Sequence, residues 1–149
     1  MTNLKLRHDA RILVCDGKTA LFLKNNGTPG HEMFEVESAI RQELPAHNAD
    51  IGADKPGRVG QAFSGPRSSI ETPDWHSEQE RAFVSKTVDD FTAHCKPWPK
   101  AQIVIVAPPR ALAVIREKAD RDLMARCVAE IDKELTRHPV AEIQKIVLG

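Results

Sequence analysis

The sequence predicts an α/β domain built on a five-stranded mixed sheet, and three observations favour this class. Residues 11–41 read as three short antiparallel strands joined by turns. An uninterrupted apolar run at 102–107 is typical of a central strand covered on both faces. Helical stripes and short β-rich runs then alternate toward the C-terminus. An antiparallel meander followed by right-handed crossovers gives the strand order 3-2-1-4-5, a ribonuclease-H-like layout with helices on both faces.

Turn residues and alternation mark the three strands of the meander. Residues 11–16 are β-rich and end at Asp16-Gly17, a strong hairpin-turn signal. The return strand spans 19–24, and a second turn at 25–30 leads to the third strand. A period of two predicts that four residues of the third strand share one face: Phe34, Val36, Ser38 and Ile40.

The segment 45–73 has no sustained period and is rich in Gly, Pro and Ser. We therefore expect a long irregular loop between the third strand and the first helix. Loops of this length are uncommon in compact domains and are usually functional or disordered. Three basic residues of the segment are candidate binding residues: Lys55, Arg58 and Arg67.

The first helix is expected to begin at Ser77, because Ser77 to Glu80 fits a capping box. Its inner stripe is formed by Val84, Val88, Phe91 and Cys95. The strand at 102–107 follows, and Pro109 suits the first residue of the next helix because a missing N–H costs nothing there.

The C-terminal part contains one ambiguous segment. Asp120 is expected to cap a short helix, and a last helix is predicted over 139–148. Between them, residues 128–132 fit either a continued helical stripe or a fifth strand. Periodicity alone favours the helix slightly.

The composition indicates one globular domain over residues 1–149, with 41% hydrophobic and 28% charged residues. Lys plus Arg equals Asp plus Glu, 21 each, so the basic excess of a general nucleic-acid clamp is missing. No apolar run has the length of a signal-peptide core or a membrane span. Cys15, Cys95 and Cys127 match no metal or disulfide spacing and are expected to be buried thiols. We therefore expect a cytoplasmic protein that contacts neither membrane nor DNA; its oligomeric state stays open.

Catalytic motifs are scarce in the sequence. Two-metal nucleases of this layout need converging carboxylates from the first strand, the first helix and the end of the fourth strand. Asp16, Glu78 and Glu80 supply the first two positions, but residues 107–110 carry no carboxylate. The sequence also has no nucleophile elbow, Walker loop or HExxH motif. We expect no metal ion and no cofactor.

Arg110 is a further candidate binding residue. It stands after the predicted fourth strand, where α/β sheets usually bind ligands, and its guanidinium can meet a phosphate or a carboxylate. The alternative, which we favour, is an ion pair with a local carboxylate such as Asp16 or Glu80. Lys133 belongs either to the same cluster or to the solvated end of a strand.

Three segments together resemble one protein family. Residues 103–112, IVIVAPPRAL, resemble its signature of a strand, Ala-Pro-Pro-Arg and a helix. Residues 132–136, DKELT, resemble its Lys-Asp-Leu-Thr segment, and residues 13–20 with 55–58 complete the set. The family is the bacterial host attachment proteins, also described as proteins required for attachment to host cells. The resemblance covers nearly the whole chain and implies that residues 128–132 form a strand.

That family is similar to the middle domain of archaeal and eukaryotic peptide-chain release factors. In those proteins a Gly-Gly-Gln tip lies on the loop between the meander and the long helix, which makes Gly60 and Gln61 candidate catalytic residues here. Val59 stands at the position of the first glycine and resists positive φ.

We favour a non-enzymatic cytoplasmic binding protein that contacts RNA or the ribosome through the 45–73 segment. One alternative is a hydrolase of peptidyl-tRNA esters. Another is a regulatory protein that affects attachment to a host indirectly.

Overall fold

The computed structural model describes residues 4–42 and 65–149, and within 65–77 only the course of the backbone. Its sheet has the order β3-β2-β1-β4-β5. The strands are β1 (Arg11–Cys15), β2 (Thr19–Asn25), β3 (Phe34–Arg41), β4 (Ile103–Ala107) and β5 (Cys127–Asp132). The first three pair antiparallel, while β4 runs parallel to both β1 and β5. The predicted mixed sheet and its strand order are confirmed.

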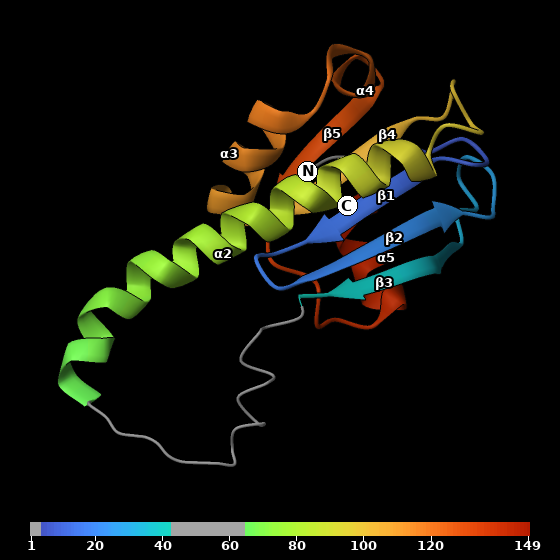
Figure 1. Cartoon of the computed structure of the whole chain (residues 1–149). Helices are drawn as coiled ribbons and strands as arrows, with labels where there is room; N and C mark the ends of the chain where they lie inside the picture. Colours follow the sequence, from blue (N-terminus) through green and yellow to red (C-terminus); the bar gives the residue numbers. More distant parts are fainter. Residues whose placement is uncertain (1–3, 43–64) are drawn as a thin grey trace.

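Helices cover both faces of the sheet, as predicted (Figure 1). The helices are α2 (Gly65–His94), α3 (Pro109–Lys118), α4 (Arg121–Ala125) and α5 (Val140–Leu148). The first three supply buried side chains to one core layer, and α5 supplies them to the layer on the opposite face.

The two core layers follow from alternation along the central strands. Leu13 and Cys15 of β1 belong to the layer beneath α2 and α3, whereas Ile12 and Val14 belong to the layer beneath α5. Every residue of β1 and of β4 is buried, because both strands have a neighbour on each edge and helices above and below. The apolar run at 102–107 is thus explained by its central position.

Several local predictions are confirmed at their residues. Pro109 is the first residue of α3, and Asp120 caps α4 with its Oδ1 accepting from the Leu123 N–H at 2.8 Å. The ambiguous residues 128–132 form a strand, as the family resemblance implied, and not a continued helix.

β3 carries a bulge that the sequence pattern does not reveal. Val36 and Ser38 pair with adjacent residues of β2, and Glu37 between them is left out of the register. One extra residue exchanges the two faces for everything beyond it. Phe34 and Val36 therefore lie on the α5 side, while Ser38 and Ile40 lie on the α2 side. The prediction that these four residues share one face is wrong.

The helix α2 begins earlier than predicted. Its first residue is Gly65, so the last part of the expected 45–73 loop is helical and Ser77 is not its N-cap. The first turns of α2 extend past the edge of the sheet (Figure 1). The sequence of these turns shows no sustained apolar stripe, so the periodicity on which the prediction relied is missing there.

The parts of the chain that the structure describes contain no helix long and apolar enough to cross a membrane.

Candidate functional site: a cleft at the strand ends

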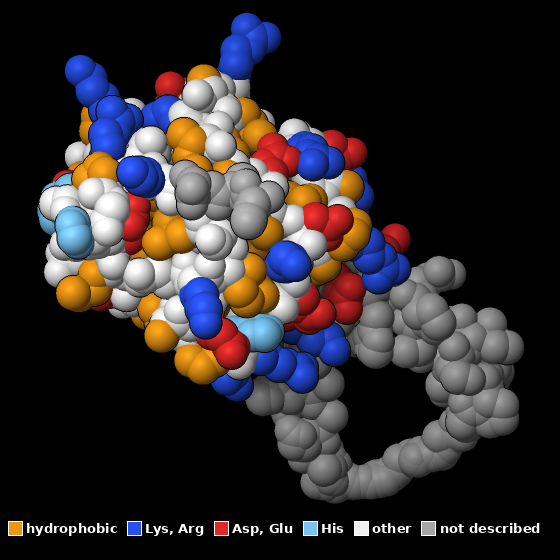
Figure 2. Space-filling view, turned by 180° about the vertical axis from the view of Figure 1, so that it is seen from behind, with side chains coloured by type: hydrophobic (Ala, Val, Ile, Leu, Met, Phe, Trp, Pro, Cys, Tyr) orange, Lys and Arg blue, Asp and Glu red, His pale blue; other side chains and the backbone are white. Residues whose placement is uncertain are grey.

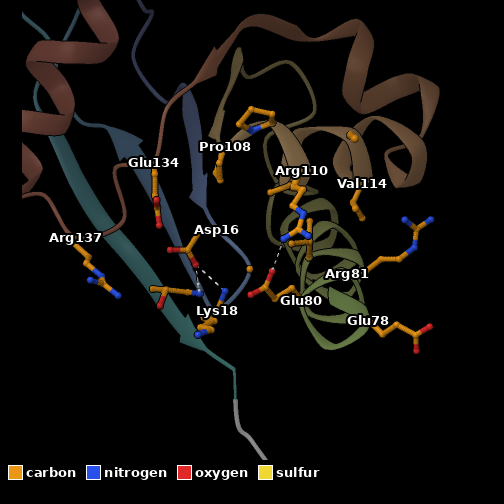
Figure 3. Close-up of a pocket in the computed structure, with 16 residues that line it drawn as sticks. Asp16, Lys18, Glu78, Glu80, Arg81, Pro108, Arg110, Val114, Glu134 and Arg137 are labelled. Atoms are coloured by element: carbon orange, nitrogen blue, oxygen red, sulfur yellow. Dashed lines mark hydrogen bonds and ion pairs between the residues drawn. The ribbon is translucent and has the colours of Figure 1, made fainter. Parts of the chain in front are cut away.

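A cleft of about 740 Å³ opens at the carboxyl ends of the parallel strands β1 and β4 (Figure 3). Its walls come from the β1–β2 turn, from α2, from the start of α3 and from the segment after β5. Ligands of open α/β sheets bind at this end of the strands, because the loops and helix starts that follow the strands converge there. A volume of this size is typical of small-molecule sites.

Asp16 holds two walls of the cleft together. Its Oδ1 accepts from the backbone N–H groups of Lys18 and Thr19, both at 2.7 Å, which closes the β1–β2 turn. Its Oδ2 accepts from the Thr136 hydroxyl at 2.7 Å, which attaches the segment after β5 to that turn. The turn-forming role that the sequence indicates for Asp16 is therefore present, with a second partner far away in the sequence.

The same hydrogen bonds set the acidity of Asp16. Burial alone would raise the pKa of this half-buried carboxyl. Hydrogen bonds from the Lys18 N–H, the Thr136 hydroxyl and the Thr19 N–H outweigh burial and hold the pKa below its ordinary value. The charged form is thus the one that the fold stabilises.

We expect Asp16→Asn to reduce stability by about 1–3 kcal/mol at neutral pH, the usual worth of hydrogen bonds to a charged group. The pKa of Asp16 is lower in the folded than in the unfolded chain. The stabilisation of the fold by the Asp16 carboxylate is therefore complete above the unfolded pKa of roughly 4, and it is lost as pH falls through the folded pKa. Urea unfolding at pH 7 and pH 2.5 should show the two proteins converging in acid. Asp132→Asn, at an exposed carboxylate at the end of β5, is the control. A gap that persists unchanged at pH 2.5 would contradict this assignment.

Gly17 allows the β1–β2 turn to approach α2 closely. A Cβ atom at this position would lie 2.6 Å from Cγ of Glu80, closer than side chains pack. Glu80 in turn forms an ion pair with Arg110, with 3.6 Å between Oε1 and Nη1. The ion pair that the sequence favours for Arg110 is present, and it crosses the cleft from α2 to α3 (Figure 3).

The floor of the cleft is apolar and its rim is charged. Val84, Ala111 and Val114 of α2 and α3 are buried beneath it, and Pro108 is half-buried beside them. The rim carries basic and acidic side chains in equal numbers: Lys18, Arg81, Arg110 and Arg137 with Asp16, Glu78, Glu80 and Glu134. Such a surface suits binding of a molecule that is partly apolar and partly charged.

The predicted site residues fall into three groups. Arg110 lines the cleft, whereas Lys133 is exposed and does not line it. Arg67 lies within the first turns of α2, where only the backbone is described. The remaining predicted residues, Lys55, Arg58, Gly60 and Gln61, lie outside the described residues.

Besides Arg81 on α2, three rim residues were missed by the sequence analysis: Lys18, Glu134 and Arg137. Lys18 directly follows the Asp16-Gly17 turn, and the other two follow the end of β5. The signal was available, since these positions come after strands that run parallel in one sheet. Glu134 and Arg137 reach the cleft because residues 127–132 form a strand parallel to β4.

The next features of the described residues are the possible metal ligands and the thiols near the cleft. Within residues 4–42 and 65–149, no group of three or more His, Cys, Asp or Glu side chains could hold a metal ion. Burial raises the pKa of Cys15, beside the cleft, to about 12, and that of Cys95 to about 11. Both thiols are protonated at neutral pH and are poor nucleophiles.

A family model described as protein required for attachment to host cells matches residues 11–147, a range that contains every residue of the cleft. No curated protein matches the chain.

Proposed function

The chain belongs to the family of proteins required for attachment to host cells, and from this premise we propose that it serves attachment as a binding protein whose recognition site is the cleft. One observation carries the proposal: an apolar floor with a charged rim lies at the carboxyl ends of β1 and β4.

Binding without catalysis is supported by how the cleft carboxylates are used. Asp16 accepts three hydrogen bonds of the fold, and Glu80 is held by Arg110. A general base needs a free lone pair directed at its substrate. These two carboxylates serve the architecture of the cleft instead.

The proposed place of action is the cytoplasm, and the proposed effect on attachment is indirect. This part of the proposal rests on the sequence-based expectation alone. Fractionation of intact cells tests this point, and protein recovered from the cell surface would contradict it.

Filling the cleft should abolish its contribution to attachment. Ala113 is exposed on α3 and lines the cleft, so Ala113→Trp places a large side chain there without removing a core residue. In a strain lacking the protein, we expect this variant to leave attachment at the level of the empty vector. Ala141→Trp, at an exposed alanine of α5 on the opposite face, should restore attachment fully. Equal rescue by both variants would remove the cleft from the function.

The segment 45–73 carries a second proposal, contact with RNA or the ribosome. Its support is the sequence alone, which places three basic residues in a Gly-, Pro- and Ser-rich stretch: Lys55, Arg58 and Arg67. Co-sedimentation with ribosomes at moderate salt should fall when all three are replaced by alanine. Release of a labelled peptide from peptidyl-tRNA that depends on Gln61 would favour the hydrolase alternative instead.

A further inference from the structure

We propose that the cleft binds an amphipathic organic anion, whose acidic group pairs with Lys18 and Arg137 and whose apolar part lies against Val84, Pro108 and Val114. This inference rests on the proposed function, because it takes the cleft as the recognition site and specifies the chemistry of what it recognises.

The charged side chains of the rim differ in whether they form ion pairs within the described structure. Arg81 is paired with Glu117, with 2.6 Å between Nη2 and Oε1, and Glu80 is paired with Arg110. By contrast, the exposed side chains of Lys18 and Arg137 have no ion-pair partner in the described parts of the chain.

Asp16, a carboxylate near these two cations, is committed to the fold. Asp16 accepts hydrogen bonds from the Lys18 and Thr19 backbone and from Thr136. Glu134 lines the cleft near Asp16 and is exposed. Glu78, from α2, points away from Asp16 (Figure 3). The end of the cleft at Lys18 and Arg137 therefore offers positive charge that an incoming anion can use.

The two cations are also placed to act together. Lys18 belongs to the β1–β2 turn and Arg137 to the segment after β5, and the bond between Asp16 and Thr136 fixes these two segments side by side. Figure 3 shows Lys18 near Asp16, with Arg137 on the other side of Glu134. Arginine and lysine at one end of a cleft can share one carboxylate or one phosphate group.

The apolar floor of the cleft favours a ligand that has an apolar part as well as a negative charge. Val84 and Val114 are buried, and they face the cleft together with the half-buried Pro108. A small inorganic ion would leave this surface in contact with water, whereas an apolar chain would cover it. Selectivity for an anion with an apolar body follows from the two features combined.

The rim also argues against a polyanion. Four carboxylates line the same cleft, and they would repel a phosphate backbone laid along its length. A ligand with a single acidic group at one end faces fewer of these carboxylates than a strand laid along the cleft. The cleft is thus suited to a compact amphipathic acid and not to a nucleic-acid strand.

Four probes test the inference on the full chain by isothermal titration calorimetry. Octanoate and octyl phosphate carry the acidic group and the apolar chain, octylammonium reverses the charge, and acetate lacks the chain. We expect at least one of the two amphipathic anions to bind about ten-fold or more tightly than octylammonium and acetate, a difference of about 1.4 kcal/mol. Which of the two anions binds more tightly identifies the acidic group as carboxylate or phosphate.

A matched pair of double variants assigns the binding to the two cations. Lys18→Glu with Arg137→Glu should weaken the better anion at least about ten-fold. Arg121→Glu with Lys145→Glu makes the same charge change at exposed positions of α4 and α5 and should leave the affinity unchanged. Thermal unfolding of each variant shows that the fold is retained.

Two results would overturn the inference: octylammonium binding as tightly as both anions, or anion affinity that the Lys18 and Arg137 variant leaves intact. Failure to detect either anion at millimolar concentration would do the same. If Ala113→Trp abolishes attachment while the probes show no preference for anions, the cleft remains the recognition site and only the ligand class is wrong. If anions bind selectively but a strain carrying Ala113→Trp attaches normally, the proposed ligand class is correct and the proposed role of the cleft in attachment is wrong.

Discussion

Replacing Glu37 by alanine is expected to lower the free energy of unfolding by about 3 kcal/mol, because it removes the nearer and more buried of the two carboxylates paired with a buried arginine. Arg11 is only 1% exposed, and its Nε lies 3.1 Å from Oε1 of Glu37. That contact is an ion pair without hydrogen-bond alignment, since Nε makes no hydrogen bond in the described structure. Glu37 therefore balances the charge of Arg11 through proximity, and removing it leaves only the more distant and more exposed Asp9 carboxylate.

The other contacts of Arg11 compensate only in part: Asp9 Oδ1 lies 3.7 Å from Nη1, but the Asp9 side chain is 45% exposed to solvent. Its guanidinium carbon lies 3.7 Å from the centre of the Trp98 ring, and its Nη1 donates to the Asp9 carbonyl at 2.8 Å. His94 Nε2 lies 2.7 Å from the same Oε1 of Glu37 and would also lose this partner. Ring and carbonyl stabilise a cation by less than a full negative charge does in a site that excludes water.

Urea unfolding with three variants separates the ion pair from general effects of mutation. Glu35→Ala, at an exposed position on the same strand, should change the stability by no more than about 0.5 kcal/mol. A double change of Arg11→Met with Glu37→Met should cost less than Glu37→Ala alone, because no unbalanced charge stays buried. Glu37→Ala within about 1 kcal/mol of Glu35→Ala would contradict this account of the pair.

The position of Glu37 also explains why the sequence misled at β3. In a regular strand its side chain would face away from Ser38 and Ile40, but the bulge frees it from the register. It can then contact Arg11 on β1 and His94 at the end of α2. An alternating pattern in the sequence cannot reveal the bulge at Glu37, because the bulge interrupts the alternation itself.

The other strands could be predicted because burial in the sheet alone determines their apolar sequence patterns. β1 and β4 are buried on both faces and contain almost only apolar residues, while the Asp16-Gly17 turn fixes how β1 and β2 pair. The start of α2 was missed for the opposite reason. Its first turns extend past the edge of the sheet, their sequence shows no apolar stripe, and the local capping-box signal at Ser77 pointed to a later start.

The candidate site could be predicted only in part. Arg110 was found because one strand end and one helix start suffice to place it. Lys18 and Arg137 come together through a bond between Asp16 and Thr136, which are 120 residues apart. No local pattern contains such a contact, which becomes visible only once β1, β4 and β5 are known to lie side by side.

The second large effect is expected at Asn25, which is fully buried and uses its whole amide group. Its Nδ2 donates to the carbonyls of Leu6 and Arg7, each at 3.0 Å. Its Oδ1 accepts from the N–H groups of Gly27 at 3.0 Å and Met33 at 2.8 Å. One side chain therefore joins the N-terminal segment to both ends of the turn between β2 and β3.

Asn25→Leu keeps a similar volume but leaves these four backbone groups without their partner, so we expect a loss of about 3–5 kcal/mol. Asn25→Asp keeps both acceptor bonds but turns an oxygen toward the carbonyls of Leu6 and Arg7. At acidic pH the added carboxyl is protonated and can donate one hydrogen bond to them. The stability of Asn25→Asp should then lie between that of Asn25→Leu and that of the wild type. Asn26→Ala, at the exposed neighbour, should cost no more than about 0.5 kcal/mol. Urea unfolding of the three variants measures the order. If Asn25→Leu is as stable as Asn26→Ala, backbone groups near the turn find other partners and the amide is not what holds the N-terminal segment to the sheet.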